Sequence, residues 1–140
     1  MIIPVNADFA VAPQIDPADV TEIARAGYRG IINNRPDGEA PDQPASEAIG
    51  RVAATLGLAY AEIPVTHAGF SHPQIDAMAA ALEAGPVLAF CRSGTRSCML
   101  WALARAKQGA DPAELHEQAA AAGYDLSPIY AMLQALAGAR

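Results

Sequence analysis

The fold of this chain is decided by one stretch of sequence, Pro86-Val87-Leu88-Ala89-Phe90-Cys91-Arg92-Ser93-Gly94-Thr95-Arg96. Its first five residues form an apolar run that predicts a buried strand, and residues 97–107 beyond it predict a helix. Residues 91–96, the cysteine loop, therefore join a strand to a helix. Backbone N–H groups of such a loop point at one spot, and the helix dipole makes that spot positive. The stretch predicts an anion cradle with a nucleophile inside it.

Cys91 is the candidate nucleophile of the cysteine loop. The positive field favours its thiolate, so we expect Cys91 to be ionised near neutral pH. Packing as a small apolar residue is the commonest role of a free cysteine, but the strand–loop–helix setting favours the nucleophile. Arg96 supplies a planar fork that binds an oxyanion through two hydrogen bonds. The other loop residues are expected to bind substrate, mainly through their backbone N–H groups: Arg92, Ser93, Gly94 and Thr95.

Two further residues at the start of the helix have two interpretations each. Ser97 is either an ordinary residue of the first helical turn or a catalytic residue whose hydroxyl donates to the Cys91 thiolate, and the sequence favours neither. Cys98 is expected to pack in the core. The alternative role for Cys98 is a resolving thiol that captures a persulfide or sulfenic acid on Cys91.

Composition limits the fold and the partners. The 140 residues are 52% apolar, which is enough for one domain spanning residues 1–140. A net charge of −6 argues against nucleic-acid and anionic-membrane partners, so the positive site must be local. Two cysteines make no disulfide framework, and the first residues resemble neither a signal peptide nor a membrane span. We expect a cytoplasmic protein.

Apolar runs and turn residues alternate along the chain. Four strands are predicted over residues 9–12, 28–33, 58–65 and 87–90. About six helices are predicted over residues 16–27, 44–56, 71–85, 97–107, 111–123 and 127–138. Strands that alternate with helices form parallel sheets with helices on both faces. The pattern therefore predicts a three-layer α/β fold around a central, mostly parallel, four-stranded sheet.

Other candidate residues lie in loops that follow the predicted strands. Arg35 is a candidate substrate-binding residue and Asp37 a candidate acid, because the carboxyl ends of parallel strands gather around one site. The alternative for each of them is a place in a solvated turn. His67 is a candidate proton donor, with a plain surface histidine as the alternative. The other histidines lack ligand spacing, so we expect no metal and no cofactor.

The spacing of the cysteine loop and the body of the chain resemble two different families. Four residues separate Cys91 from Arg96, as in rhodanese sulfurtransferases, whereas tyrosine and dual-specificity phosphatases have five. The opening of the chain and its long helical tail resemble the dual-specificity phosphatase fold. Together they resemble one bacterial family, the phosphatase-like domain also found in beta-lactamase-hydrolase-like proteins. The stretches that carry this resemblance are residues 32–39, 63–66, 91–97 and 100–103.

The resemblance implies a cysteine-dependent enzyme but leaves its reaction open. Phosphatases place a general-acid aspartate where this chain has His67, and a sulfane sulfur donor releases groups that leave without an acid. We therefore expect a sulfurtransferase that forms a Cys91 persulfide on a phosphatase-like scaffold. The alternatives are a phosphatase using Asp37 or His67 as acid, and a non-catalytic module that binds anions or persulfides. Expected partners are a small anionic or persulfide substrate and a sulfur-accepting protein, with the oligomeric state open.

Overall fold

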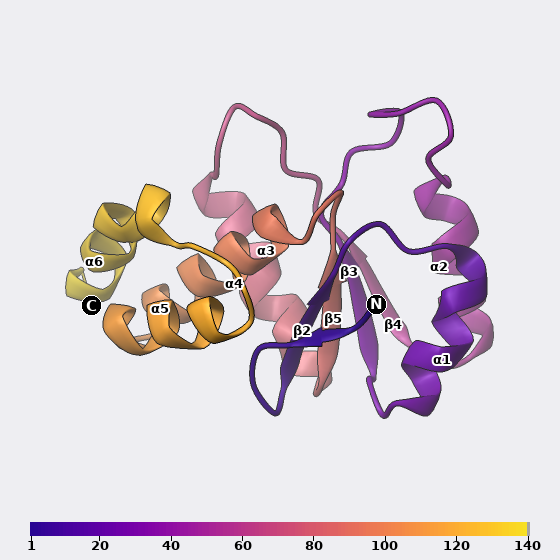
Figure 1. Ribbon diagram of the computed structural model, residues 1–140, viewed down its shortest axis with the longest axis horizontal. Helices are drawn as coiled ribbons and strands as arrows, with labels where there is room; N and C mark the ends of the chain where they lie inside the picture. Colours follow the sequence, from indigo (N-terminus) through magenta and orange to yellow (C-terminus); the bar gives the residue numbers. More distant parts are fainter. Residues whose placement is uncertain (140) are drawn as a thin grey trace.

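The computed structural model describes residues 1–139 and contains one sheet with helices on both faces (Figure 1). The sheet has five strands in the order β1-β2-β5-β3-β4. Their bounds are β1 Ile3–Pro4, β2 Phe9–Ala12, β3 Gly30–Asn33, β4 Ala59–Glu62 and β5 Val87–Phe90. All pairs are parallel except β1 with β2. The predicted α/β class and mostly parallel sheet are confirmed.

The strand β1 is an addition to the four predicted strands. It is two residues long and pairs antiparallel with β2 at the edge of the sheet. Its second residue, Pro4, has no N–H to donate, which restricts it to a sheet edge. A two-residue strand that contains proline leaves no alternating pattern in the sequence, so it was not predicted.

Helices cover the sheet as two layers (Figure 1). On one face lie α1 and α2, and on the other lie α3, α4, α5 and α6. Their bounds are α1 Val20–Arg25, α2 Ser46–Thr55, α3 His72–Ala81, α4 Thr95–Lys107, α5 Pro112–Ala121 and α6 Tyr130–Gly138. Short 3-10 turns η1 Pro17–Asp19, η2 Leu82–Ala84 and η3 Ser127–Ile129 precede α1, follow α3 and precede α6. The predicted number of helices is confirmed.

Successive strand residues face opposite layers, because side chains alternate across a strand. In β2, Phe9 and Val11 join the core beneath α4, whereas Ala10 and Ala12 join the core beneath α1 and α2. All four residues of β5 are buried, since β5 lies between β2 and β3 with helices on both faces. Continuous apolar runs such as residues 87–90 are therefore signs of a central parallel strand.

Helix α4 is the central helix of its layer. It is buried along most of its length, and its Trp101 ring stacks on Phe9 of β2 with the ring centroids 5.1 Å apart. Helix α4 begins at Thr95, two residues earlier than predicted, because Gly94 acts as its N-cap. Burial fixes the axis of α4, so its N-terminus stays aimed at the end of β5. Residues 1–139 contain no helix that is both long and apolar enough to span a bilayer.

Candidate active site

The cysteine loop starts where β5 ends, at the carboxyl edge of the sheet. Cys91 directly follows β5, and Gly94 turns the chain into α4 with a φ of +92°, which glycine adopts without strain. The Gly94 N–H donates to the Cys91 sulfur over 3.1 Å. A backbone N–H aimed at the sulfur stabilises a thiolate over a thiol, because it can only donate.

Neighbouring strand ends hold the cysteine loop in place. The N–H of Asn34, after β3, donates to the Phe90 carbonyl over 2.8 Å, and the N–H of Gln14, after β2, donates to the Arg92 carbonyl over 3.3 Å. The Asn34 side chain is buried and donates to the Ile63 carbonyl at 2.9 Å. Asn34 thus braces the loop.

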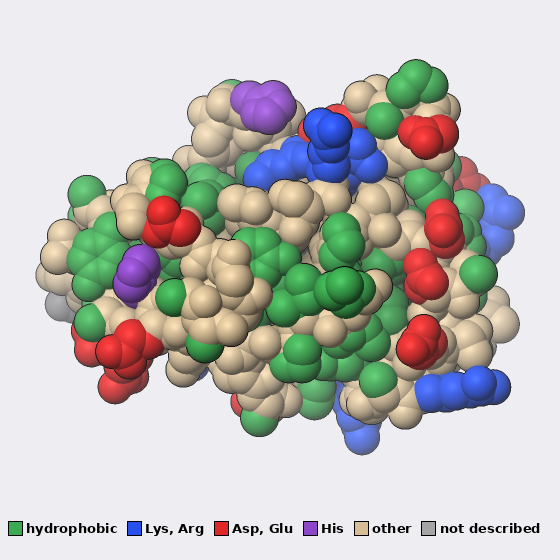
Figure 2. Space-filling model, in the orientation of Figure 1, with side chains coloured by type: hydrophobic (Ala, Val, Ile, Leu, Met, Phe, Trp, Pro, Cys, Tyr) green, Lys and Arg blue, Asp and Glu red, His purple; other side chains and the backbone are tan. Residues whose placement is uncertain are grey.

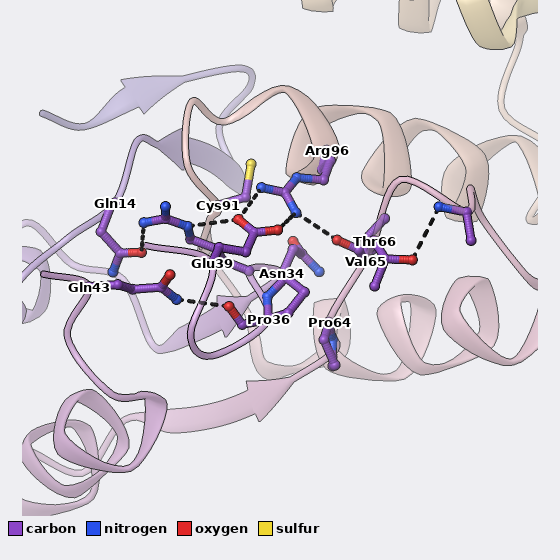
Figure 3. Close-up of polar contacts among 12 residues, drawn as sticks. Gln14, Asn34, Pro36, Glu39, Gln43, Pro64, Val65, Thr66, Cys91 and Arg96 are labelled. Carbon is purple, nitrogen blue, oxygen red and sulfur yellow. Dashed lines mark hydrogen bonds and ion pairs between the residues drawn. The ribbon is translucent and has the colours of Figure 1, made fainter. Parts of the chain in front are cut away.

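Arg96 is held by a carboxylate from the loop after β3 (Figure 3). Its Nη1 donates to Glu39 Oε2 at 2.6 Å and its Nη2 donates to Glu39 Oε1 at 2.9 Å. The same Nη1 also donates to the Val65 carbonyl at 2.7 Å. These bonds occupy the end of the guanidinium, so the edge formed by Nε and Nη2 remains for an oxyanion.

Arg35 binds the same carboxylate from a second direction. Its Nε donates to Glu39 Oε1 at 2.9 Å, and its Nη1 donates to Gln14 Oε1 at 3.0 Å (Figure 3). The hydrogen bond from Arg96, followed by that from Arg35, lowers the pKa of Glu39 to about 2 against the opposing effect of burial. Glu39 in turn raises the pKa of Arg96, and the charge of Cys91 raises it further. Glu39 is therefore a permanent anion between two arginines.

A pocket of about 650 Å³ opens above these residues. Figure 2 shows basic side chains gathered in a hollow between two loops at this edge of the molecule. The residues that line it are Gln14, Asp16, Arg35, Glu39, Ala40, Pro41, Asp42, Gln43, Pro44, His67, Arg92 and Arg96. Cys91 has no exposed surface and is not among the residues that line the pocket.

The structure brings four of the predicted site residues to one pocket: Arg35, His67, Arg92 and Arg96. Two others interact within the cysteine loop, where the Ser93 and Thr95 hydroxyls lie 3.0 Å apart. Ser97 is fully buried, and no described residue hydrogen-bonds to its hydroxyl. Of the two interpretations of Ser97, the one in which its hydroxyl donates to the Cys91 sulfur is therefore not observed.

Asp37, a candidate acid, makes a structural contact in the loop after β3. Its Oδ1 accepts the backbone N–H of Ser46 over 2.9 Å at the start of α2, where an unpaired N–H needs an acceptor. In the part of the chain that the structure describes, the residues that line the pocket do not include Asp37. Asp37 is therefore a helix-capping residue, and the acid assigned to it has no support in this geometry.

Cys98 matches the core interpretation. Its side chain has no exposed surface, and burial together with the charge of Cys91 raises its pKa to about 12. A neutral buried thiol is a poor nucleophile. The structure therefore gives no support to a resolving role.

Sequence reasoning missed the residues that control the site from other segments. Glu39 lies four residues after Arg35 in a loop rich in proline and glycine. Such a loop has no hydrophobic periodicity, so the sequence does not predict where the Glu39 side chain lies. Tyr124, between α5 and η3, donates from its hydroxyl to the Ser93 carbonyl over 3.0 Å. Asp16 and Asp42 also line the pocket. The one feature of the sequence that could have indicated Glu39 is its spacing of four residues from Arg35, because an arginine and a glutamate at that spacing can form an ion pair within a turn.

Known proteins resemble this chain in sequence and in fold. The beta-lactamase hydrolase-like protein of Xylella fastidiosa is 41% identical over 110 residues, which are 77% of this chain and 26% of that protein. The chain thus spans about a quarter of the length of the curated relatives it matches. The structure of a candidate phosphatase from Neisseria meningitidis is 31% identical, with a TM-score of 0.81 over 96% of this chain and 97% of that one.

More distant structures share the fold alone. Pseudomonas aeruginosa TpbA is 18% identical, with a TM-score of 0.67 over 99% of this chain and 89% of that one. The resemblance to phosphatases inferred from the sequence is confirmed, and the relatives and structures named here are phosphatase-like. Residues 2–110, which include the strands and the cysteine loop, match the family described as the phosphatase-like domain of beta-lactamase hydrolase-like protein. This chain belongs to that family of phosphatase-like domains.

Proposed function

We propose that this chain is a cysteine-dependent phosphatase that hydrolyses phosphate monoesters through a phosphocysteine on Cys91. The family match over residues 2–110 and the 31% identity to a candidate phosphatase support a phosphatase over a sulfurtransferase. One observation carries the proposal. The Gly94 N–H donates to the Cys91 sulfur, and Arg96 in the same loop keeps its Nε–Nη2 edge for an oxyanion. A thiolate beside an anion fork is suited to attack on phosphorus.

The proposed reaction has two steps. In the first, the Cys91 thiolate attacks phosphorus, an S–P bond forms, the P–O bond to the leaving group breaks, and the leaving oxygen takes a proton. In the second, water attacks phosphorus, the S–P bond breaks, and orthophosphate and the thiolate are released. Arg96 and the loop N–H groups stabilise the negative oxygens in both steps. The overall reaction is hydrolysis, with no change in oxidation state.

His67 is the proposed proton donor to the leaving oxygen. It lines the pocket, whereas Asp37 is occupied at the start of α2. An acid matters most for a poor leaving group, because an alkoxide departs slowly without a proton. We expect His67→Asn to slow hydrolysis of an alkyl phosphate by about 100-fold or more and that of para-nitrophenyl phosphate far less. Equal losses on both substrates exclude His67 as the acid, and Asp42→Asn and Asp16→Asn then identify a carboxylate donor by the same comparison.

Hydrolysis of para-nitrophenyl phosphate by variants of the two cysteines tests the function itself. The wild type and Cys98→Ala are expected to hydrolyse the ester, because Cys98 is a core residue. Cys91→Ser is expected to lose activity to background. Activity that survives in Cys91→Ser contradicts the phosphocysteine route, and inactivity of the wild type on aryl and alkyl phosphates contradicts the phosphatase.

Sulfur transfer is the second candidate, and the spacing of the loop favours it. Four residues separate Cys91 from Arg96, and the carboxylate bound to Arg96, Glu39, is held by two arginines and has no proton to give. A thiolate that attacks the sulfane sulfur of thiosulfate forms an S–S bond and releases sulfite, which leaves without an acid. Incubation with thiosulfate followed by intact mass measurement separates the two candidates. One added sulfur on the wild type and none on Cys91→Ser supports transfer, whereas an unmodified wild type that hydrolyses phosphate esters supports the phosphatase.

A further inference from the structure

A tyrosine from the C-terminal part of the chain touches the cysteine loop from outside. The Tyr124 hydroxyl donates to the Ser93 carbonyl over 3.0 Å, across 31 positions of sequence. Tyr124 lies beyond residues 2–110, where the family match ends. The reaction as described above uses no residue of this C-terminal region, so the contact has no role in it yet.

The Ser93 carbonyl belongs to the same peptide group as the Gly94 N–H. In a trans peptide these two groups point in opposite directions, and the group rotates as one rigid unit. The Gly94 N–H donates to the Cys91 sulfur at 3.1 Å, while the carbonyl accepts from Tyr124. A bond that fixes the carbonyl end therefore also fixes the direction of the N–H end, which is the one aimed at the nucleophile.

The end of α5 holds Tyr124 in position. Gly123 has a φ of +96°, and its N–H donates to the Ala120 carbonyl at 3.0 Å. The Tyr124 N–H donates to the Ala119 carbonyl at 2.9 Å, which completes the two-bond pattern that ends many helices. Leu126, two residues later, is fully buried in the core beneath α4. The backbone at Tyr124 is thus anchored on both sides.

The fit between the tyrosine and the loop leaves no room for a side chain at position 94. A Cβ placed on Gly94 would lie 2.2 Å from the Tyr124 oxygen and 3.0 Å from its Cζ. Burial raises the pKa of Tyr124 above its ordinary value, so its hydroxyl remains a donor at neutral pH. The charge of Cys91 contributes to the raised pKa of Arg96, of Cys98 and of Tyr124.

We propose that Tyr124 is a positioning residue that holds the Ser93–Gly94 peptide group so that its N–H points at the Cys91 sulfur. The inference rests on the proposed role of Cys91 as nucleophile. Tyr124 acts through the peptide group and touches no reacting atom. Part of the stabilisation of the Cys91 thiolate therefore comes from the segment that joins α5 to η3.

Alkylation of Cys91 by iodoacetamide as a function of pH tests the inference without any phosphatase substrate. Tyr124→Phe keeps the ring and removes only the hydroxyl, and Tyr130→Phe is the matched control, since Tyr130 begins α6 and packs its ring against His116. Both variants are made on Cys98→Ala, so that only Cys91 reacts. We expect the midpoint of the pH profile to rise by about half to one pH unit in Tyr124→Phe, as expected for one weakened hydrogen bond to the thiolate. The midpoint of Tyr130→Phe should match that of the parent.

The midpoint reports on the thiolate, whereas the plateau rate reports on access to the buried sulfur. A second readout is the amide ¹⁵N–¹H resonance of Gly94, which should shift in Tyr124→Phe and not in Tyr130→Phe. An unchanged midpoint and an unchanged Gly94 resonance in folded Tyr124→Phe would overturn the inference. A wild type that hydrolyses no phosphate ester but shows the shifted midpoint would overturn the proposed function and leave the inference standing.

Discussion

Glu39 binds the guanidinium of Arg96 through both carboxylate oxygens, with N–O distances of 2.6 and 2.9 Å. A carboxylate and a guanidinium paired in this way share one plane, which sets the direction of the remaining Nε–Nη2 edge. Glu39 is therefore part of the machinery that orients the anion fork, although it comes from the loop after β3.

Replacing Glu39 tests this orientation. Glu39→Gln keeps the shape of the side chain but loses the charge and one acceptor for Arg96 and Arg35. We expect kcat/KM for para-nitrophenyl phosphate to fall by up to about 100-fold, because small displacements of a transition-state group have effects of that size. Glu47→Gln, which removes an exposed partner of Arg51 on α2, is the matched control and should retain wild-type activity. Wild-type activity in Glu39→Gln would contradict the positioning role.

The same carboxylate makes the stability of the protein depend on acid. The pKa of Glu39 is lowered from 4.5 to about 2, chiefly by the hydrogen bond from Arg96. A lowered native pKa contributes stability that is complete above the unfolded value and is lost as the pH falls through the native value. Thermal unfolding midpoints should therefore decline from about pH 4.5 towards pH 2 more steeply for the wild type than for Glu39→Gln. Parallel curves for the two proteins would show that the ion pair adds no pH-dependent stability.

Gly94 is expected to tolerate no side chain. Gly94→Ala forces a Cβ to within 2.2 Å of the Tyr124 hydroxyl and places alanine at a φ of +92°. Gly27→Ala is the matched control, because Gly27 has a φ of +99° and open space around its Cβ position. Gly27→Ala should cost about 1 kcal/mol of unfolding free energy from backbone strain alone, with activity intact. Gly94→Ala should cost more and lose activity, and equal effects in denaturant unfolding and activity assays would contradict the close fit.

Cys98 is expected to stay unreactive in the folded protein. Its pKa of about 12, raised by burial, leaves it protonated at ordinary pH. Iodoacetamide at pH 8 should modify Cys91 alone in the native state and both cysteines in denaturant, as read by peptide mass mapping. Cys98→Ala should lose about 1 kcal/mol of stability through the lost sulfur contacts. A disulfide between Cys91 and Cys98 after mild oxidation would instead identify a resolving thiol.

The sequence predicts the order of strands and helices in this fold better than the residues at which each element begins and ends. Strands such as residues 9–12 and 87–90 coincide with β2 and β5, because buried parallel strands are short apolar runs bounded by turn residues. The helix predicted over residues 71–85 is present as α3 and η2, with Ser71 and Gln74 forming a capping box at its start. Strand β1 was not expected, since two residues carry no period, and α4 begins early because Gly94 caps it.

The residues of the site also differ in how well the sequence predicts them. Cys91 and Arg96 were expected from local sequence, because a strand, a tight loop and a helix fix them relative to each other. The sequence left the role of Asp37 open between an acid and a residue of a solvated turn, since a loop acid that caps a helix and one that protonates a substrate look alike in sequence. Glu39 and Tyr124 were missed because their contacts depend on the path of an aperiodic loop and on how α5 packs. Both are properties of tertiary structure.

The covalent intermediate tests the central claim most directly. A radiolabelled aryl phosphate is mixed with the protein, the reaction is quenched in acid within one turnover, and the labelled peptide is identified by mass. The account predicts phosphate on Cys91 in the wild type, none in Cys91→Ser, and labelling of Cys91 in Cys98→Ala. Hydrolysis with no label on Cys91, or a protein that takes sulfur from thiosulfate onto Cys91 and never phosphate, would contradict it.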